Sequence, residues 1–330
     1  MGISTREGRK ILPFCCLILL AGCATPRGAA RTAEVGLPTL ENLIARALTP
    51  DDALLIGAGD IADCGSQLQH AKDTAAIIDK FPKATVFTAG DDAYENGTER
   101  NFKECYGASW GRFKERTRPS PGNHDYGIYP PVHRNNARPY FSYFGANAGP
   151  GNLGYYSYDL GGWHIVSLNS MADQTGASPK MADQVAWLKE DLDHTRKSCI
   201  LAYWHHPLFS SGDAHGDQAG DSGRFTGPLW DVLLDHKADV IVNGHDHHYE
   251  YFRPQDSKGR ADAQGIRQFI VGTGGGEERG IGTVKPNSEV RLAHTYGVLL
   301  MTLHPNSYEW HFINANGTVE DGSPGSVECH

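Results

Sequence analysis

A stretch in the first third of the chain combines two residue types that together suit a pair of metal ions. It runs from Gly90 to Tyr94 and follows the apolar run 84–89, which we expect to form a buried strand that the glycine ends. The carboxylate of Asp91 has two oxygens, so it can bridge two cations. The phenol of Tyr94, three residues later, is an unusual ligand that only a strongly Lewis-acidic metal ionises. The spacing therefore predicts that this turn lies at the centre of a two-metal site.

Four more polar residues stand close after the ends of other apolar runs. In open α/β sheets, binding sites form just beyond the carboxyl ends of the strands. Each residue alone has a plainer explanation, such as a turn carboxylate, a packed imidazole or an Asx turn. Together, in residue types that bind metals, they predict a row of ligands along one sheet edge. The five strand-end residues are Asp60, Asp91, Asn123, His205 and His245.

The elements that must position these residues alternate between strands and helices. A strand over 53–58, a helix over 67–81 and the strand over 84–89 make a βαβ unit, which requires parallel pairing. The polar and aromatic stretch 126–154 is too long for a connector, so we expect a loop over the site. The other expected elements are helices over 99–106, 182–194 and 228–236, a hairpin over 155–168, and strands over 200–204, 239–243, 267–271, 297–303 and 307–313.

The charge composition bears on whether the chain binds nucleic acid. The 330 residues carry a net charge of −9, and no block of Lys or Arg stands out after the N-terminal segment. A chain of this kind lacks the electrostatic footprint of a nucleic-acid-binding protein, so we expect no nucleic-acid binding. Histidine is abundant, and eight of the 16 histidines lie between His194 and His248. That concentration favours metal or acid–base chemistry.

The N-terminus has the pattern of a targeting segment. Arg6, Arg9 and Lys10 precede the apolar run 11–20, which is too short to span a bilayer. Small residues then lead to Cys23, and this arrangement resembles the lipobox of bacterial lipoproteins. The resemblance implies cleavage before Cys23, lipid on that cysteine, and export to the periplasmic or outer-membrane face of a bacterial membrane. A plain secretory signal is the alternative.

Four segments follow from these features. We expect a lipoprotein signal peptide over 1–22 and a tether over 23–50, where Pro, Gly and Ala are frequent. A single catalytic domain is expected over 51–322, followed by a C-terminal tail over 323–330. A chain of this length can bury a substantial core in one large domain.

Export also bears on the cysteines that remain after the signal. In an oxidising compartment, four cysteines allow two disulfides in three pairings. Cys64 and Cys105 each lie shortly after a proposed metal-bearing turn, which favours that pair, whereas Cys199 opens an apolar strand and has simple burial as its alternative role. No C-x-x-C is present, so a thiolate zinc site is not indicated. The four cysteines are Cys64, Cys105, Cys199 and Cys329.

Five short motifs occur in a fixed order along the chain. They are Gly59-Asp60, Gly90-Asp91, Gly122-Asn123-His124-Asp125, His205 before Pro207, and Gly244-His245-Asp246-His247. This order and spacing resemble the calcineurin-type metallophosphoesterases from about Asp52 to His248, and the C-terminal strands look similar through about Asp321. Most of that superfamily carries Asp-x-His in the first motif, but here Ala62 stands where the histidine would be. Tyr94 fills the gap, and that exchange resembles the purple acid phosphatase branch.

The resemblance implies a complete ligand set for two metal ions, with Asp91 bridging them. The ligands of the first site are Asp60, Tyr94 and His247, and those of the second are Asn123, His205 and His245. Hard oxygen ligands with a phenolate favour Fe(III) in the first site. Two imidazoles and an amide suit a divalent ion such as Zn, Mn or Fe(II) in the second.

The resemblance also implies a mechanism of phosphoric ester hydrolysis, in which a metal-bridging hydroxide attacks phosphorus in line without a covalent enzyme intermediate. His124 lies beside a ligand and would bind the phosphate or stabilise its developing charge. His215 occupies about the place of the leaving-group acid, with a solvated loop histidine as the alternative. His206 and His248 would be pocket walls or would support the ligands from behind, without binding a metal themselves. Relatives often have an arginine two residues after Tyr249, where this chain has Tyr251, which leaves any role of that arginine in doubt.

The fold implied by the resemblance is a four-layer αββα sandwich, with two mixed β-sheets face to face and helices outside. The favoured function is that of an acid phosphatase acting on small phosphomonoesters at the membrane to which Cys23 attaches the chain. One alternative is a phosphodiesterase that uses the same site. Another is a non-catalytic, metal-binding surface lipoprotein, but the presence of all seven ligands favours an enzyme.

Overall fold

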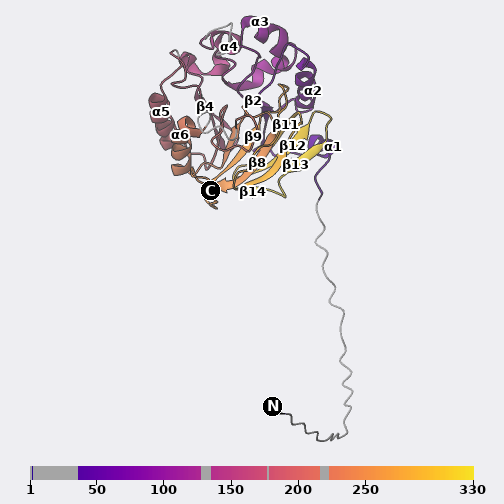
Figure 1. Ribbon diagram of the computed structural model, residues 1–330, viewed down its shortest axis with the longest axis vertical. Helices are drawn as coiled ribbons and strands as arrows, with labels where there is room; N and C mark the ends of the chain where they lie inside the picture. The colour runs from indigo at the N-terminus through magenta and orange to yellow at the C-terminus, as the bar shows by residue number, and fades with distance from the viewer. Residues whose placement is uncertain (1, 3–35, 128–134, 177, 216–222) are drawn as a thin grey trace. The chain divides into compact units, whose positions relative to one another are not determined.

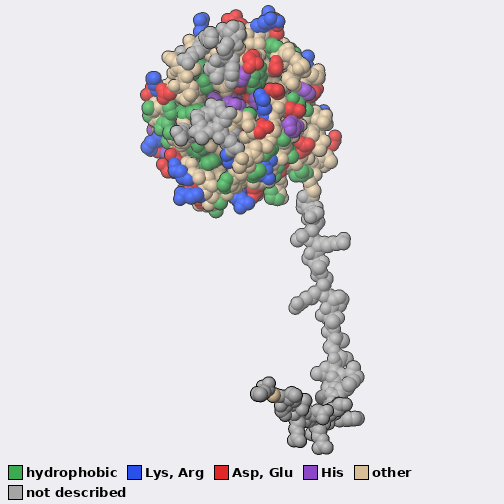
Figure 2. All heavy atoms as spheres, in the orientation of Figure 1, with side chains coloured by type: hydrophobic (Ala, Val, Ile, Leu, Met, Phe, Trp, Pro, Cys, Tyr) green, Lys and Arg blue, Asp and Glu red, His purple; other side chains and the backbone are tan. Residues whose placement is uncertain are grey.

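Two mixed β-sheets lie face to face between outer helices, so the predicted αββα sandwich is confirmed (Figure 1). The computed structural model describes residues 2, 36–127, 135–176, 178–215 and 223–330. Residues Leu37–His330 form one compact unit. On its visible face, Lys and Arg side chains are interspersed with Asp and Glu, without a large field of one sign (Figure 2).

The first sheet contains the βαβ unit that the sequence predicts. Its strand order is β13-β12-β11-β1-β2-β3, and β14 pairs with β12. The β1–β2 and β2–β3 pairs are parallel, while β11 joins β1 in antiparallel register, with Ala53 opposite Leu303. The strands are β1 Ala53–Ala58, β2 Thr85–Ala89, β3 Thr117–Ser120, β11 Gly297–Leu303, β12 Ser307–Asn314, β13 Val319–Gly322 and β14 Val327–Glu328.

The second sheet has the order β10-β8-β9-β7-β6-β5-β4. Its central strands β5, β6, β7 and β9 are parallel, and antiparallel pairs flank them on both sides. The β4–β5 pair is the predicted hairpin across Gly161 and Gly162. The strands are β4 Tyr156–Leu160, β5 Trp163–Ser167, β6 Cys199–Trp204, β7 Val240–Asn243, β8 Tyr249–Gln255, β9 Ile266–Val271 and β10 Ser288–Leu292.

Helices cover the outer faces of the sandwich, with α5 and α6 on one side of it (Figure 1). They are α1 Leu40–Ala45, α2 Leu68–Ile78, α3 Glu99–Asn101, α4 Arg138–Phe144, α5 Met181–His194 and α6 Gly223–Asp235. A wide helical turn, 102–106, continues α3, and tighter turns follow at 110–116, 145–148 and 150–152. In the part of the chain that the structure describes, no helix combines the length and the apolar character needed to cross a membrane.

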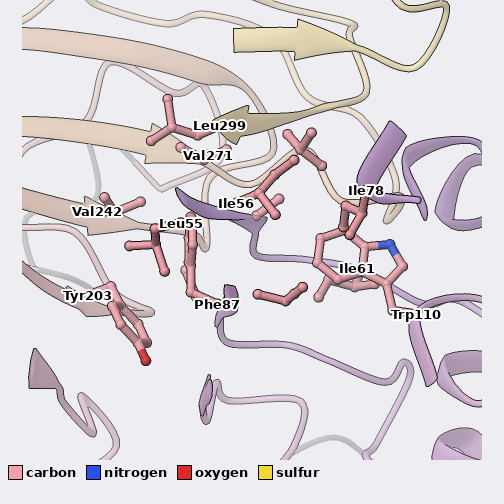
Figure 3. Packing of buried hydrophobic residues seen from close by; sticks show 14 of the residues in the cluster. Leu55, Ile56, Ile61, Ile78, Phe87, Trp110, Tyr203, Val242, Val271 and Leu299 are labelled. Carbon is pink, nitrogen blue, oxygen red and sulfur yellow. The ribbon is translucent and has the colours of Figure 1, made fainter. Parts of the chain in front are cut away.

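The main core fills the space between the two sheets. Phe87 of β2 and Tyr203 of β6 bring their rings to 5.5 Å across this space, beside Leu55 and Val242 (Figure 3). A second cluster lies between the other face of the second sheet and the helices α5 and α6. Because β6 is covered on both faces, all six of its residues are buried, which explains why the strand is a continuous apolar run in the sequence.

Several elements differ from the sequence-based expectation. The stretch 126–154 is wrong as a simple loop over the site, since it contains α4, whose Tyr140 and Phe144 are buried in the main core; residues 128–134 lie outside the described residues. Five strands are also additional to those expected, namely β3, β8, β10, β13 and β14. The first contains Pro119, and the second contains Glu250 and Pro254, so neither shows a clean apolar alternation.

The folded unit extends beyond the domain bounds of 51 and 322 expected from sequence. At its start, α1 buries Leu40, and Arg46 forms a bidentate ion pair with Glu309 of β12 (2.5 and 2.7 Å). At its end, β14 pairs with β12, and Cys329 is bonded to Cys199. The last part of the expected tether and the expected tail therefore belong to the folded unit.

Two disulfides join the four cysteines. Cys64 is bonded to Cys105, which confirms the pair that the sequence favours. Cys199 is bonded to Cys329, so this cysteine is not only a buried residue of β6. The second disulfide attaches the end of the chain to the start of a central strand across a sequence separation of 130 residues.

We expect the double variant Cys199→Ala/Cys329→Ala to unfold at lower urea concentration, with a loss of about 2–4 kcal/mol in the free energy of unfolding. The matched variant Cys64→Ala/Cys105→Ala opens a shorter loop, with a separation of 41 residues. Loop entropy alone makes its loss about 1 kcal/mol smaller. Urea unfolding of metal-free protein under non-reducing conditions measures both. Unchanged stability of the first variant would show that β14 holds the chain end without the disulfide.

Candidate metal centre

The predicted residues meet at one edge of the sandwich, where parallel strands of both sheets end. The strands β1, β2 and β3 are parallel neighbours in one sheet, and β6 and β7 in the other. Backbone hydrogen bonds join the sheets here, since the Gly59 amide donates to the Val271 carbonyl (2.8 Å) and the Gly274 amide donates to the Gly59 carbonyl (2.9 Å). The side chains that leave this edge are those of Asp60, Asp91, Asn123, His205 and His245.

Three of these residues have a backbone conformation that is uncommon outside glycine. Asp60, Asp91 and His245 have φ angles of 59°, 52° and 72°. Such conformations cost about 1–3 kcal/mol each and persist only where the surrounding structure holds them, often at functional sites. Each angle turns the chain sharply at a strand end. The fold thus uses backbone strain to aim these side chains at one another.

The glycines of two motifs are required by close approach. At Gly90 the φ angle is +84°, and a Cβ atom would lie 2.6 Å from the Cβ and ring atoms of His205. At Gly122 a Cβ atom would overlap the carboxylate of Asp91. A larger residue at either position would push a predicted ligand out of the cluster. The motif glycines therefore allow strands from the two sheets to bring their polar residues into contact.

The first predicted site is assembled as a compact group. The hydroxyl of Tyr94 lies 2.8 Å from Oδ1 of Asp60 and 3.2 Å from Nε2 of His247. That same nitrogen lies 3.1 Å from Oδ1 of Asp60. Asp60 is fully buried, and Tyr94 is nearly so.

The second predicted site lies next to the first. The Nε2 atom of His205 is 3.0 Å from Oδ1 of Asn123 and 3.2 Å from Nδ1 of His245. It is also 3.1 Å from Oδ2 of Asp91. The same oxygen of Asp91 lies 3.4 Å from the hydroxyl of Tyr94, so one carboxylate reaches both groups. The structure therefore brings all seven predicted ligands into one cluster, with Asp91 in contact with both groups.

Hydrogen bonds behind the site set the orientation of the histidine rings. Nδ1 of His205 donates to the Ala89 carbonyl (2.9 Å), and Nδ1 of His247 donates to the Glu277 carbonyl. In neutral imidazoles this places the lone pairs of both Nε2 atoms toward the cluster, as metal-binding histidines require. Carboxylates are oriented in the same way, since Oδ2 of Asp60 accepts from the amide of His245 (2.8 Å).

This arrangement leaves acceptor atoms facing one another. Around Nε2 of His205 stand a carboxylate oxygen, an amide oxygen and a second ring nitrogen, all within 3.2 Å. Lone pairs packed this closely repel unless a proton or a cation lies among them. In the described part of the chain, only histidines form ion pairs with Asp60 and Asp91, and no Lys or Arg does. Two buried carboxylates without a Lys or Arg partner fit a site built for cations.

The pKa shifts agree with this interpretation. Burial lowers the pKa of His205, but the charge of Asp91 outweighs it and raises this pKa to about 9. Burial, together with the charges of Asp60 and Asp91, raises the pKa of Tyr94 well above its usual value. A phenolate at this position therefore needs a strongly polarising cation beside it.

The two predicted catalytic histidines lie on different sides of the cluster. The His124 amide donates to Oδ1 of Asp91 (2.8 Å), its Nε2 lies 3.8 Å from Oδ2 of Asp91, and its ring is 4.4 Å from that of Tyr94. The ring of His215 stacks on that of His245 with centroids 4.0 Å apart. Its amide donates to Oδ1 of Asp246 (3.2 Å), which places this histidine against the second group.

The two predicted wall histidines have different environments. The ring of His206 lies 4.2 Å from that of His245, and its Nδ1 is hydrogen bonded to the hydroxyl of Ser170 (2.9 Å), so His206 borders the site. His248 is turned away and contacts Glu250 through Nε2 (3.0 Å). Sequence reasoning did not identify Ser170, because a serine after a β-strand carries no distinctive signal.

The sequence also did not predict a role for the buried carboxylate of Asp125, which lies behind the ligands. Asp125 accepts hydrogen bonds from the amides of Gly122 (2.9 Å) and Asp92 (3.1 Å). Burial and the charge of Asp91 raise the pKa of Asp125 to about 7. Asp125 thereby ties the turn after β3 to the turn after β2, which fixes Asn123 relative to Asp91. Its place in the third motif was the available signal.

Comparison with known proteins agrees with this geometry. Residues 33–249, about two thirds of the chain, match the family described as calcineurin-like phosphoesterase. Purple acid phosphatase 15 of Arabidopsis thaliana is 26% identical over 293 residues, which cover 84% of this chain and 50% of that protein. Purple acid phosphatase 21 of the same plant is 33% identical over 127 residues, 38% of this chain and 27% of that protein. The chain thus spans about half the length, or less, of these curated relatives.

Solved structures share the fold. A purple acid phosphatase from yellow lupin (Lupinus luteus) seeds superposes with a TM-score of 0.64 at 16% identity, covering 82% of this chain and 53% of that one. GAP50, described as the anchor in the inner membrane complex of Plasmodium, superposes with a TM-score of 0.59 at 15% identity, covering 84% and 89%. On the family match, with purple acid phosphatases among its relatives, the chain belongs to the calcineurin-like phosphoesterase family of metal-dependent hydrolases.

Proposed function

We propose that this chain is a phosphomonoesterase of the acid phosphatase type that works with two metal ions. The observation that carries the proposal is the set of mutually facing acceptors joined by one oxygen of Asp91. The buried ligand atoms fit two cations that share this carboxylate, and no Lys or Arg of the described residues takes the place of these cations. The relatives named purple acid phosphatases support the same reaction class.

The two groups differ in chemistry, so we propose different ions for them. Asp60, Tyr94 and His247 would hold Fe(III), because a buried phenol ionises only beside a strongly Lewis-acidic cation. Asn123, His205 and His245 would hold a divalent ion such as Zn, Mn or Fe(II), which imidazole nitrogens suit. When bound, such a pair activates water as the nucleophile and neutralises charge on the phosphoryl oxygens.

The chain's own residues would orient the ester and handle its charge and its proton. His124 lies on the Tyr94 side of Asp91 and is mostly buried, so its ring can donate to a phosphoryl oxygen. His215, against His245, stands on the other side and can give a proton to the leaving alkoxide. His206 is held by Ser170, and burial together with the charge of His205 lowers its pKa well below the usual value. It therefore stays neutral and can serve as a wall of the substrate site.

The same proposal includes a location. The basic and apolar N-terminal segment ending in Cys23 supports export and lipid attachment at that cysteine. A phosphatase held there would act on phosphate esters outside the cytoplasm. The two disulfides are consistent with an oxidising compartment.

Purified protein loaded with iron and zinc should hydrolyse p-nitrophenyl phosphate much faster than bis(p-nitrophenyl) phosphate, because a monoester presents more charged oxygens to two cations. The kcat/KM values for the two substrates make the comparison. A preference for the bis-ester would support a phosphodiesterase, and no turnover of either ester in metal-replete protein would support a non-catalytic surface lipoprotein. Removal of both metals by chelation should abolish turnover.

Replacing Tyr94 by Phe tests the first metal. With Fe(III) bound, the native protein should be pink to purple from phenolate charge transfer, and Tyr94→Phe should lose that visible band. The matched variant Tyr143→Phe, on α4 away from the cluster, should keep it. A colourless iron-loaded native protein, or a band that survives in Tyr94→Phe, contradicts the assignment.

Replacing His205 or Asn123 by Ala tests the second metal. Each variant removes a contact at the Nε2 position where acceptors converge, so turnover should fall by more than about a hundredfold and the content of divalent metal should fall with it. The control is His194→Ala, an exposed histidine in the last turn of α5. Full activity in either site variant would rule out the two-metal mechanism, provided that circular dichroism shows a native fold.

A further inference from the structure

An apolar groove lies far from the metal centre, beside α1. It is a cavity of about 440 Å³, lined mainly by Leu43, Ile44, Leu48, Leu54, Phe81 and Leu300. Figure 1 shows α1 beside β11, β12 and β13 of the first sheet. Helix α1 and the segment after it cover only part of this face. The groove is therefore left open between α1 and the segment that follows α2.

Two exposed apolar side chains line the groove. In the part of the chain that the structure describes, four large hydrophobic side chains are exposed: Ile44 (44%) and Leu48 (37%) line the groove, and Leu37 (46%) precedes α1. The fourth, Val284, lies elsewhere, in the loop before β10. Single exposed apolar residues are ordinary, but two beside one open apolar groove mark a surface that something covers.

Basic side chains border the same groove. Arg46, Lys80 and Lys83 line it together with the apolar residues. Arg46 is already paired with Glu309, so the two lysines after α2 supply the available positive charge. Glu41 and Asp79 lie near Lys80, and Asp79 is paired with Arg112 (2.5 Å). Apolar tips beside lysines suit the boundary between headgroups and acyl chains of a lipid bilayer.

The N-terminal attachment indicates what covers this surface. If Cys23 carries lipid, as the proposed function includes, only 13 residues separate the anchor from Leu37, where the folded unit begins. Even at full extension, this length of chain spans at most about 50 Å. Leu37 is itself one of the exposed apolar residues. The chain therefore enters the folded unit just before α1, the helix that borders the groove.

We propose that this face, formed by Ile44, Leu48, Lys80 and Lys83, docks on an anionic phospholipid surface. The apolar side chains enter the headgroup boundary, and the two lysines contact lipid phosphates. The inference rests on the lipid anchor of the proposed function.

Docking in this way determines where the metal centre faces. Leu54 is the second residue of β1, and Lys80 and Lys83 precede β2, so the groove lies at the amino ends of these strands. Asp60 and Asp91 follow the carboxyl ends of the same strands. From Leu54 to Ala58, the last residue of β1, the strand advances by about 13 Å, and Asp60 lies beyond that end. The metal edge therefore points away from the bilayer, toward soluble phosphate esters and not toward the headgroups of the lipids beneath it.

Hydrogen exchange on the mature, lipidated protein tests the docking. The protein is reconstituted in phosphatidylcholine vesicles with and without phosphatidylglycerol, and peptides over 40–48 and 79–84 are followed by mass spectrometry. We expect severalfold slower exchange in these peptides with phosphatidylglycerol than in detergent solution, and unchanged exchange over 244–248 at the metal edge.

Two variants and one control make the test specific. Ile44→Asp/Leu48→Asp and Lys80→Glu/Lys83→Glu alter exposed positions of the face, and each should lose the protection. Val284→Asp, at the exposed apolar residue elsewhere, should keep it. The proposal is overturned if the protection is absent or if it persists in both double variants. It is also overturned if the protection appears without vesicles as protein concentration rises, because the face would then bind a second copy of the chain.

The same samples separate failure of the docking from failure of the function. The mass of the N-terminal peptide reports whether Cys23 carries lipid, and an unlipidated peptide would overturn the anchor and the docking together. Turnover of p-nitrophenyl phosphate reports the phosphatase activity and should be unchanged in both double variants. Protection without turnover would contradict the proposed catalysis but support the docking. Turnover without protection in lipidated protein would support the proposed catalysis and contradict the docking.

Discussion

The structure depends on one electrostatic constraint, which is the burial of two carboxylates with no Lys or Arg side chain of the described residues paired to them. Asp60 and Asp91 are 0% and 1% exposed, and the described ion pairs bring only histidines to them. Burying charge in this way is costly unless opposite charge compensates it. Cations supply that charge, so the site is completed by what it binds. The stability of the sheet edge and its chemistry thus have a common origin.

The fold brings these carboxylates together by means of strained backbone conformations and of glycines at positions where a side chain would not fit. Positive φ angles at Asp60, Asp91 and His245 turn three strand ends toward a common point. Gly90 and Gly122 leave no Cβ atom where His205 and Asp91 must pass. Unfavourable local conformations can persist because two large sheets, packed through a continuous core, hold the strands that carry them. The same core that stabilises the fold therefore makes the site geometry possible.

Much of this could be predicted from the sequence, for a reason that also explains the misses. The strands β1, β2, β6 and β7 are buried on both faces. Each can therefore be recognised in the sequence as an apolar run, and a polar residue follows shortly after its end. The strand β3 has only four residues, two of which are Arg118 and Pro119. It pairs with β2 through backbone hydrogen bonds, and such pairing produces no pattern of apolar residues in the sequence. The same limit applies to Asp125 and Ser170, whose roles depend on contacts between distant turns. Resemblance to a family was needed to assign Tyr94, since residue spacing alone cannot distinguish a metal ligand from a buried phenol.

A parallel βαβ unit also places two surfaces at opposite ends of its strands, one at the carboxyl ends and one at the amino ends. Its carboxyl ends converge with those of the second sheet and become the polar edge, while its amino ends, on the far side, are closed only by α1 and the turn after α2. Helix α1 has six residues and leaves Ile44 exposed, so it is too short to cover the apolar surface at that end. The strand direction that brings Asp60 to Asp91 is therefore the same direction that leaves a groove beside the start of the folded unit. In a chain attached to a bilayer just before that point, one topological fact would place the substrate edge outward and the uncovered edge against the lipid.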